Sequence, residues 1–388
     1  MRSFARSPLW PWAKVVVLLV VLDWALFGAG LFFRWVPQIR RFPITWGLVY
    51  RCVQQLQTAP EPPLAYAVGS SIVFLGLDER RVRGAMAERQ VPSAFETLTV
   101  FGAFGVDQAL LAHAAIPTHP WLVVLTASVR DFPAQASLDT PVSRVFFDSS
   151  VALPAAQPTD VEGRLAAIVR RHWMLYRYRF FVRTALDEAT TPLFMSIAPK
   201  LAKPLPAPGP LQLPSASGAP VPEEASQWFF PGRLTAESWA AWKHWRETRR
   251  FADYEDFLNV NRSGAIEQYG RQTFATHGPE RNVHLDAIAW STEELRAAAI
   301  RVVVLDFPEN PVLEDPEARA LYDTTLSDAV ARRLEQDATA RGARFVDLRH
   351  VLDAEDFYDL IHPNVSGSRK LSDRLGAIVA EEWKAAGR

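Results

Sequence analysis

The stretch that decides the fold is LAYAVGSSIVFLGLD, residues 64–78. Its first part, Leu64 to Val68, is a short apolar run that ends at Gly69, a pattern typical of a buried strand that enters a turn. The segment DERRVRGAMAER, residues 78–89, indicates a helix soon after it. A buried strand followed by a helix predicts one unit of a parallel α/β sheet.

The same alternation of strand and helix recurs on both sides of a long interruption. The apolar patterns predict, in chain order, a strand at Phe95–Phe101, a helix at Val106–Ala115, a strand at Trp121–Thr126, a strand at 301–307, a helix at Ala318–Arg341 and a strand at 344–348. The last segment predicts an amphipathic terminal helix, because its apolar residues have helical spacing: Leu371, Leu375, Ile378, Val379 and Trp383. The sequence therefore predicts an α/β fold, a three-layer sandwich with helices on both faces of a parallel sheet.

An apolar run from Val15 to Phe33 precedes this domain and is about long enough for a helix to cross the hydrocarbon of a membrane. We expect a single-pass anchor. A cleaved signal peptide is the alternative, although no small-x-small cleavage site follows the run. Asp23 disfavours both interpretations, because an ionisable group inside a membrane is costly. The charge rule does not decide the orientation, since basic residues lie on both sides of the run: Arg2, Arg6 and Lys14 before it, and Arg34, Arg40 and Arg41 after it.

These patterns divide the chain into an N-terminal tail, anchor and connector over residues 1–63 and a sheet domain over residues 64–388. The sheet domain is interrupted by an insertion, residues 132–292, which we expect to form a cap or lid, or else a separate subdomain. The insertion contains a predicted helix, Arg164–Leu186. It also contains a stretch from Pro192 to Pro222 whose nine prolines exclude a continuous helix or a central strand.

Two aromatic features of the insertion each have two interpretations. The segment RRHWMLYRYRFFVR, residues 170–183, suits a helix that lies on anionic headgroups or binds an acidic polymer, but a helix packed on the domain by its aromatic face is favoured. Trp239, Trp242 and Trp245 recur at steps of three and suit a sugar-stacking surface. Core or interface positions are favoured for them.

Composition excludes several classes of function. Lysine and arginine total 42 and aspartate and glutamate total 43, so no global attraction to nucleic acid is indicated. Cys52 is the only cysteine, which excludes an intramolecular disulfide and a multi-cysteine metal site, and we expect it to be buried. We predict no cofactor and no metal, because the following histidines show no metal-ligand spacing: His113, His119, His172, His244, His277, His284 and His350.

Ser71 follows the first predicted strand, at the edge where an open parallel sheet places its binding crevice. A serine hydroxyl needs a base within hydrogen-bond reach to become a nucleophile. The segment DFYDLIHPN, residues 356–364, offers Asp359 and His362 three residues apart, a spacing at which the carboxylate can hold one imidazole nitrogen and leave the other for the serine. Only Asp359 has this spacing among the nearby acidic residues, which also include Asp353, Glu355 and Asp356.

These two stretches together carry a resemblance to a known family. AVGSSIVFLGLD, residues 67–78, resembles the first sequence block of SGNH (GDSL-like) hydrolases, in the form found in membrane-attached members such as DltD and the alginate O-acetylation proteins AlgJ and AlgX. DFYDLIHPNVSG, residues 356–367, is similar to their closing block. The resemblance covers roughly residues 64–130 and 300–388. It implies a flavodoxin-like sandwich with Ser71 as nucleophile, Asp359 as orienting acid and His362 as base.

The resemblance also implies an oxyanion hole. FGAFGVD, residues 101–107, resembles the second block, so the amides of Gly105 and Ser71 are the expected donors. The third block normally supplies an asparagine, but TASVRDF, residues 126–132, has none. The nearest residues are Ser128, Arg130 and Asp131, so the third donor is substituted, supplied by the insertion, or missing.

Three hypotheses of function follow from the resemblance. The first is a membrane-anchored serine esterase or O-acyltransferase, with acetyl as the expected group, that acts on a cell-envelope glycan from the periplasmic or extracellular side of the cell membrane. The second is a broad esterase or lipase whose lid is the insertion. The third is a catalytically weakened binding or scaffolding partner of a multi-pass acyltransferase. Acyl esters or acylated glycans are the expected substrates, and no nucleic acid partner is expected.

Overall fold

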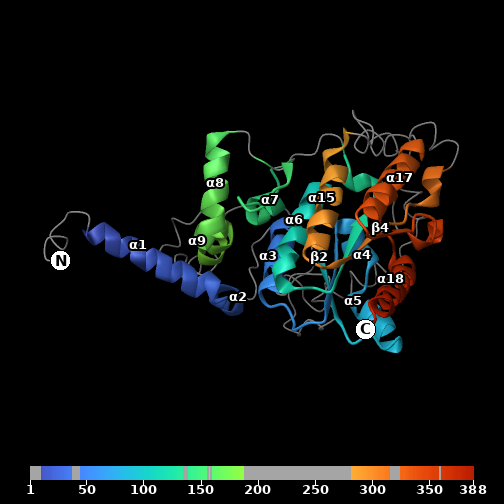
Figure 1. Cartoon of the computed structure of the whole chain (residues 1–388), viewed down its shortest axis with the longest axis horizontal. Helices are drawn as coiled ribbons and strands as arrows, with labels where there is room; N and C mark the ends of the chain where they lie inside the picture. Colours follow the sequence, from blue (N-terminus) through green and yellow to red (C-terminus); the bar gives the residue numbers. More distant parts are fainter. Residues whose placement is uncertain are drawn as a thin grey trace, which may run out of the picture. The chain divides into compact units, whose positions relative to one another are not determined.

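The computed structural model describes residues 10–36, 44–133, 139–154, 157, 160–187, 281–314, 324–357 and 360–388. The chain divides into two compact units, and Figure 1 labels many of their elements. The larger unit takes in residues 44–146, 153–156 and 212–388 and contains the sheet. The smaller unit takes in residues 1–43, 147–152 and 157–211 and contains the apolar N-terminal helix. The Trp239, Trp242 and Trp245 series and the proline-rich stretch lie outside the described residues.

The larger unit is built on a sheet whose five described strands are all parallel, in the order β2-β1-β3-β4-β5. The strands are β1 (Leu64–Gly69), β2 (Ala94–Thr99), β3 (Leu122–Ala127), β4 (Arg301–Asp306) and β5 (Arg344–Asp347). Every residue of β1 and of β3 is buried, as expected for central strands covered on both faces. The predicted α/β fold is confirmed, and the strand order is the flavodoxin-like one, with its switch point between β1 and β3.

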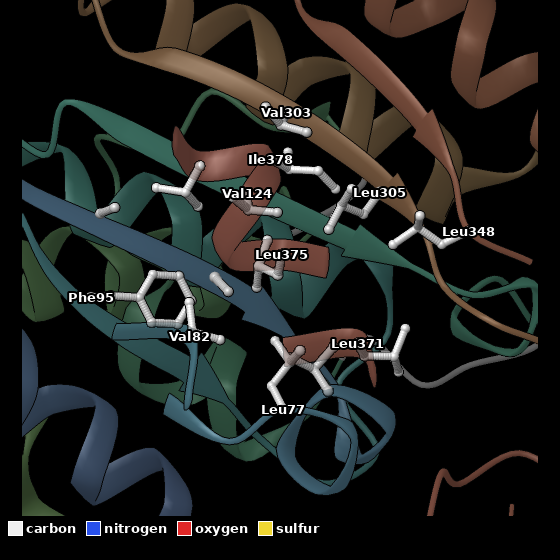
Figure 2. Packing of buried hydrophobic residues seen from close by; sticks show 14 of the residues in the cluster. Leu77, Val82, Phe95, Val124, Val303, Leu305, Leu348, Leu371, Leu375 and Ile378 are labelled. Atoms are coloured by element: carbon white, nitrogen blue, oxygen red, sulfur yellow. The ribbon is translucent and has the colours of Figure 1, made fainter. Parts of the chain in front are cut away.

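One face of the sheet is covered by α4 (Ser71–Gly76), α5 (Glu79–Glu88) and the terminal helix α18 (Val365–Ala385). The predicted amphipathic pattern of the last segment is confirmed, because its apolar residues enter the core of this face. Figure 2 shows these side chains packed between the helices and the strands, among them Leu77, Val82, Phe95, Val124, Leu305, Leu371, Leu375 and Ile378.

On the other face, four of the described helices contact the strands. These are α3 (Ile44–Gln57) over β2, α6 (Gly105–Ala115) over β1 and β3, α15 (Val283–Ala297) over β4, and α17 (Thr324–Ala340) over β5. The helix predicted at Ala318–Arg341 is thus described from Thr324 onward. The range of the expected insertion, 132–292, contains α7 (Pro141–Phe146) and the first part of α15, which packs on α6. Cys52 is buried as predicted, and burial raises the pKa of its thiol to about 12.

The smaller unit begins with α1 (Trp10–Asp23), which continues as a π-helical turn, η2 (Trp24–Gly28). The span Pro11–Gly28 has a mean hydropathy of 1.7 and is long and apolar enough to cross a membrane, judged by length and composition. The apolar run does not form one helix to Phe33 as expected. Gly30 adopts a positive φ of 67°, which ends the first helix, and Leu31–Trp35 forms a separate short helix, α2.

The helix expected at Arg164–Leu186 is also interrupted. Its residues form α8 (Val161–His172), then α9 (Met174–Arg177), and residues 179–187 are again helical. Trp173 is extended between α8 and α9, with φ −132° and ψ 97°. The amides that follow it are bonded to a side chain from another part of the smaller unit, which gives a physical reason for the break.

Candidate functional site

The turn that carries Ser71 is fixed by its neighbours in sequence. The strand β1 ends at Gly69, and Ser70 caps α4 by accepting a hydrogen bond from the amide of Ile72 at 3.4 Å. Ser71 is the first residue of α4, at the carboxyl end of β1 and beside the switch point of the sheet. An amide at a first helical position has no intrahelical acceptor, so the main chain here can donate to a ligand.

Close packing behind this turn requires glycine at position 69. A Cβ atom there would overlap the hydroxyl of Thr126 and the side chain of Val73. The Thr126 hydroxyl donates to the carbonyl of Val68 at 2.6 Å, which ties the end of β1 to its neighbour β3. The sequence Val-Gly-Ser-Ser therefore supplies both the tight strand end and the position of Ser71 at the edge of the sheet.

His362 lies in the loop that precedes α18. Phe357 and Pro363 form an isolated antiparallel bridge across the base of this loop, and Asn364 caps α18 by accepting from the amides of Ser366 and Gly367. Pro363 disfavours helical geometry at the residue before it, so His362 lies outside the helix. The loop is thus closed at its base by its own residues.

The structure brings Ser71 and His362 together. The Ser71 hydroxyl oxygen lies 3.1 Å from Nε2 of His362, although the two residues are separated by 291 positions in the sequence. This is hydrogen-bond distance, and the hydroxyl donates to Nε2 when the imidazole carries its hydrogen on Nδ1. A serine whose hydroxyl donates to an imidazole is the pairing that nucleophilic catalysis needs.

Asp359, the predicted third member, lies outside the described residues. The competing acid Asp356 is buried and is occupied elsewhere, because its carboxylate lies 2.6 Å from Nζ of Lys370. Asp353 is largely exposed, with 86% of its side chain accessible, and lies 3.7 Å from the same lysine. Both acids therefore contact a lysine of α18.

Asp131 is one of the residues nearest the position of the expected third oxyanion donor, and its carboxyl is engaged by other groups of the protein. It is buried, its carboxyl is hydrogen-bonded to the side chains of Ser70 and Gln108, and it accepts from the amide of Ser128 at 3.0 Å. Burial raises the pKa of Asp131 to about 7, although these hydrogen bonds oppose the rise. Asp131 therefore links the segment after β3 to the turn that carries Ser70 and Ser71 and to α6.

Ser128, another residue near that position, has a local role. Ser128 caps the short 3₁₀ turn Val129–Asp131 and accepts from the amide of Arg130 at 3.4 Å.

Asp306, at the end of β4, is also buried, and burial raises its pKa well above the usual value. Its carboxylate lies 3.4 Å from the guanidinium of Arg349.

Gly105 is the first residue of α6, at the carboxyl end of β2, and is buried against the main chain of His284. Nδ1 of His284 accepts from the amide of Val106 at 3.2 Å, so this imidazole caps α6. Burial lowers the pKa of His284 to about 4. His284 and Asn364 were not predicted as part of the site; the only sequence signal for Asn364 was its place directly after His362 and Pro363.

Within the described residues no group of three or more histidine, cysteine, aspartate or glutamate side chains is placed to hold a metal ion. A cavity of about 680 Å³ opens at the amino ends of β3 and β4, lined in part by Pro63, His119, Trp121, Arg296 and Arg388. This is the edge of the sheet opposite to the Ser71 turn, and the cavity includes neither Ser71 nor His362.

The chain is similar to solved structures with which it shares little sequence. No protein-family model matches the chain, and no curated protein matches it significantly. A crystal structure of a Bacteroides fragilis protein, provisionally described as an acylhydrolase, is similar with a TM-score of 0.36 and 11% sequence identity, over 85% of this chain and 93% of that one. The closer resemblance to DltD and the alginate O-acetylation proteins is not shown. The site is therefore interpreted from its own geometry.

Proposed function

We propose that this chain is a serine esterase or O-acyltransferase in which Ser71 is the nucleophile, His362 the general base and Asp359 the acid that orients the imidazole. The observation that carries the proposal is the distance of 3.1 Å between the Ser71 hydroxyl and Nε2 of His362. Support also comes from the position of Ser71 after β1, because ligands of open α/β sheets bind at the carboxyl ends of the strands, beside a switch point.

The proposed first half-reaction forms an acyl-enzyme. Nε2 of His362 takes the proton of the Ser71 hydroxyl while its oxygen attacks the ester carbonyl, which gives a tetrahedral intermediate with a negative oxygen. The amides of Ser71 and Gly105 are the proposed donors to that oxygen. The carbon–oxygen bond to the leaving alcohol then breaks, and His362 returns the proton to that alcohol.

The second half-reaction distinguishes hydrolysis from transfer. Water or a sugar hydroxyl gives its proton to His362 and attacks the acyl-Ser71 carbonyl, after which the bond to the Ser71 oxygen breaks and the proton returns to that oxygen. An added oligosaccharide acceptor should yield acylated product if the protein is a transferase. If the protein is a plain esterase, only free acid should form, with or without the acceptor.

Turnover of an activated acetyl ester, p-nitrophenyl acetate, tests the nucleophile. Ser71→Ala should reduce turnover to the background rate. Ser366→Ala, which alters an exposed serine in the first turn of α18, should leave turnover unchanged. Wild-type turnover by the Ser71→Ala variant would remove Ser71 from the mechanism.

The role of Asp359 is tested by a pair of matched variants. Asp359→Asn should lower kcat by on the order of 10³ to 10⁴-fold, because an unoriented imidazole presents the wrong tautomer. Asp353→Asn alters an exposed acid six residues earlier and should have little effect. A loss of kcat in Asp353→Asn with normal turnover in Asp359→Asn would show that Asp353, and not Asp359, orients the imidazole.

We also propose that the apolar helix α1 anchors the enzyme in a cell membrane, with the catalytic unit on the periplasmic or extracellular side and an envelope glycan as the acylated substrate. The support for the anchor is the length and hydropathy of Pro11–Gly28. Retention of the full chain in the membrane fraction after washing with alkaline carbonate is the expected result, and its release by that wash would contradict the anchor.

A second candidate function is a scaffold that binds acyl groups without turnover. The observation that favours it is Asp131, one of the three residues nearest the place where the family resemblance implies an asparagine donor, because its carboxyl is engaged by Ser70 and Gln108. A protein that binds an acylated glycan but shows no turnover of any ester would support the scaffold over the enzyme.

A further inference from the structure

The apolar span Pro11–Gly28 contains one acidic residue, Asp23, whose carboxylate is bonded within the smaller unit. The amide of Met174 donates to its Oδ2 at 3.2 Å, and the amide of Leu175 donates to its Oδ1. These amides open α9 and have no acceptor within that helix. Asp23 therefore caps α9 from about 150 residues away along the chain.

Aromatic packing strengthens this junction. The ring of Tyr178, directly after α9, lies 5.2 Å from the ring of Phe27 and 5.3 Å from that of Phe33, measured between centroids. All three side chains are almost fully buried. The segment that begins at α9 is thus joined to the C-terminal part of the apolar helix by both hydrogen bonds and packing.

The junction lies inside the apolar span. Asp23 precedes Gly28 by five residues, which corresponds to roughly 7 to 8 Å along a helix. If the span crosses a bilayer, the first amides of α9 lie below the level at which the span ends. Backbone amides buried in lipid must be satisfied internally, and the Asp23 carboxylate does this.

The helix α8, which leads into this junction, has an apolar row facing solvent. Val161, Leu165 and Ile168 are spaced by four and three residues and are 72%, 57% and 48% exposed. Such spacing puts the three side chains on one helix face. Figure 1 shows that α8 runs across the direction of α1 rather than along it. If α1 crosses a bilayer, α8 would therefore lie closer to the bilayer plane than to its normal.

The charge of this segment complements anionic lipid. Residues 160–187 contain six arginines against three acidic residues. Arg170 and Arg171 lie in the last turn of α8, near the junction with the apolar helix. An exposed apolar row combined with arginines is the composition of a helix that lies in the membrane interface.

We propose that the segment 160–187 is a second membrane-associated element, held against the apolar helix by Asp23, with the Val161, Leu165 and Ile168 row among the lipid acyl chains. The inference rests on the proposed anchoring of α1. It identifies the bilayer as the partner of this surface and makes Asp23 a structural requirement for that contact.

Depth-dependent fluorescence quenching in vesicles tests the proposal. The full chain, with Cys52→Ala to remove its one cysteine, would receive a single cysteine at Val17, Leu165 or Gln336 and an environment-sensitive label. Each sample is reconstituted in phosphatidylcholine and phosphatidylglycerol vesicles, with or without lipids that carry a nitroxide on the acyl chain. Gln336, exposed on α17 of the sheet unit, is the aqueous control.

The expected result is a loss of emission at Leu165 comparable with that at Val17, and no loss at Gln336. Quenching at Val17 with none at Leu165 would overturn the inference and leave the anchor intact. Absence of quenching at Val17 would refute the anchor itself, and with it the arrangement proposed for α8.

A second variant tests the contribution of Asp23. Asp23→Leu makes the span more apolar, so insertion and quenching at Val17 should persist. The cap of α9 is lost, and quenching at Leu165 should fall. Leu22→Ala, at the neighbouring exposed position, is the matched control and should retain both signals. Full quenching at Leu165 in Asp23→Leu would contradict the role of the carboxylate.

Discussion

Asn364 donates from its Nδ2 atom to the main-chain carbonyl of Glu355 at 2.6 Å, so the residue that caps α18 also holds the start of the loop that carries His362. Its side-chain carbonyl accepts from the amides of Ser366 at 2.9 Å and Gly367 at 3.1 Å. The side chain is completely buried. One side-chain amide therefore connects the loop that carries His362 to α18.

Replacement of Asn364 should affect stability and turnover together. Asn364→Ala leaves the Glu355 carbonyl and two amides without their partner, which should cost about 1 to 3 kcal/mol of unfolding free energy. Turnover should fall mainly in kcat, because the imidazole is less well held. Denaturant unfolding and steady-state kinetics measure the two effects.

Asn282→Ala is the matched control for that experiment. Asn282 caps α15 by accepting from the amides of His284 and Leu285, and it donates to the carbonyl of Phe132 at 2.7 Å. Its loss should lower stability by a similar amount but lower kcat less, because its hydrogen bonds hold α15 rather than the loop that carries His362. An equal loss of kcat in both variants would show that Asn364 acts only through stability.

Gly69→Ala should disturb the turn that carries Ser71. The new methyl group would overlap Thr126 and Val73, so β1 or α4 must shift, and both stability and ester turnover should fall. Gly84→Ala places a methyl group on α5 with no atom within 4 Å and should stabilise by up to about 1 kcal/mol. Normal turnover by Gly69→Ala would mean that the turn adapts without moving Ser71.

Asp131 should make the protein less stable as the pH rises. Burial raises its pKa from 3.8 to about 7 in the folded state, so the folded protein binds a proton that the unfolded chain has released between these values. Its contribution to stability is therefore present below about pH 4 and is lost progressively up to about pH 7. In Asp131→Asn that part of the pH dependence should disappear from the unfolding free energy.

Asp107→Asn separates the effect of Asp131 on stability from its effect on the site. Burial also raises the pKa of Asp107 to about 7, but this acid bonds to the hydroxyl of Thr140 rather than to Ser70. Both variants should flatten the pH dependence of stability. Only Asp131→Asn should change ester turnover, and equal turnover in the two would exclude a positioning role for Asp131.

His284 predicts a pH dependence of the opposite sign. Burial lowers its pKa from 6.5 to about 4, so the unfolded chain binds a proton that the folded protein excludes. Stability is complete above about pH 6.5 and is lost as the pH falls toward 4. His284→Gln should remove this acid-side loss, as measured by thermal unfolding across that range. A wild-type slope in the variant would assign the loss to other groups.

Local patterns were sufficient to predict the sheet. Leu64–Val68 and 301–307 are apolar runs because both faces of these strands are covered. Such a run can be recognised from the few residues of the strand alone. The terminal helix was predicted for a similar reason, since Leu371, Leu375 and Ile378 repeat at helical spacing and enter the core.

The breaks in the predicted helices were not foreseeable from such patterns. The segment 170–183 is periodic enough for one helix, but its amides at Met174 and Leu175 are bonded to Asp23, a contact between distant parts of the chain. Asp131 was considered a candidate donor from its position after β3. Its contact with Ser70 depends on how three segments meet, which no local pattern encodes.

The residue to which a fluorophosphonate probe attaches shows whether Ser71 is the activated nucleophile that we propose. The intact protein should gain one probe adduct, and peptide mass analysis should locate it on Ser71. His362→Asn, which removes Nε2 from the 3.1 Å contact, should abolish the labelling while the protein remains folded. An unlabelled wild-type protein, or an adduct on another residue, would contradict the assignment of Ser71 as an activated nucleophile.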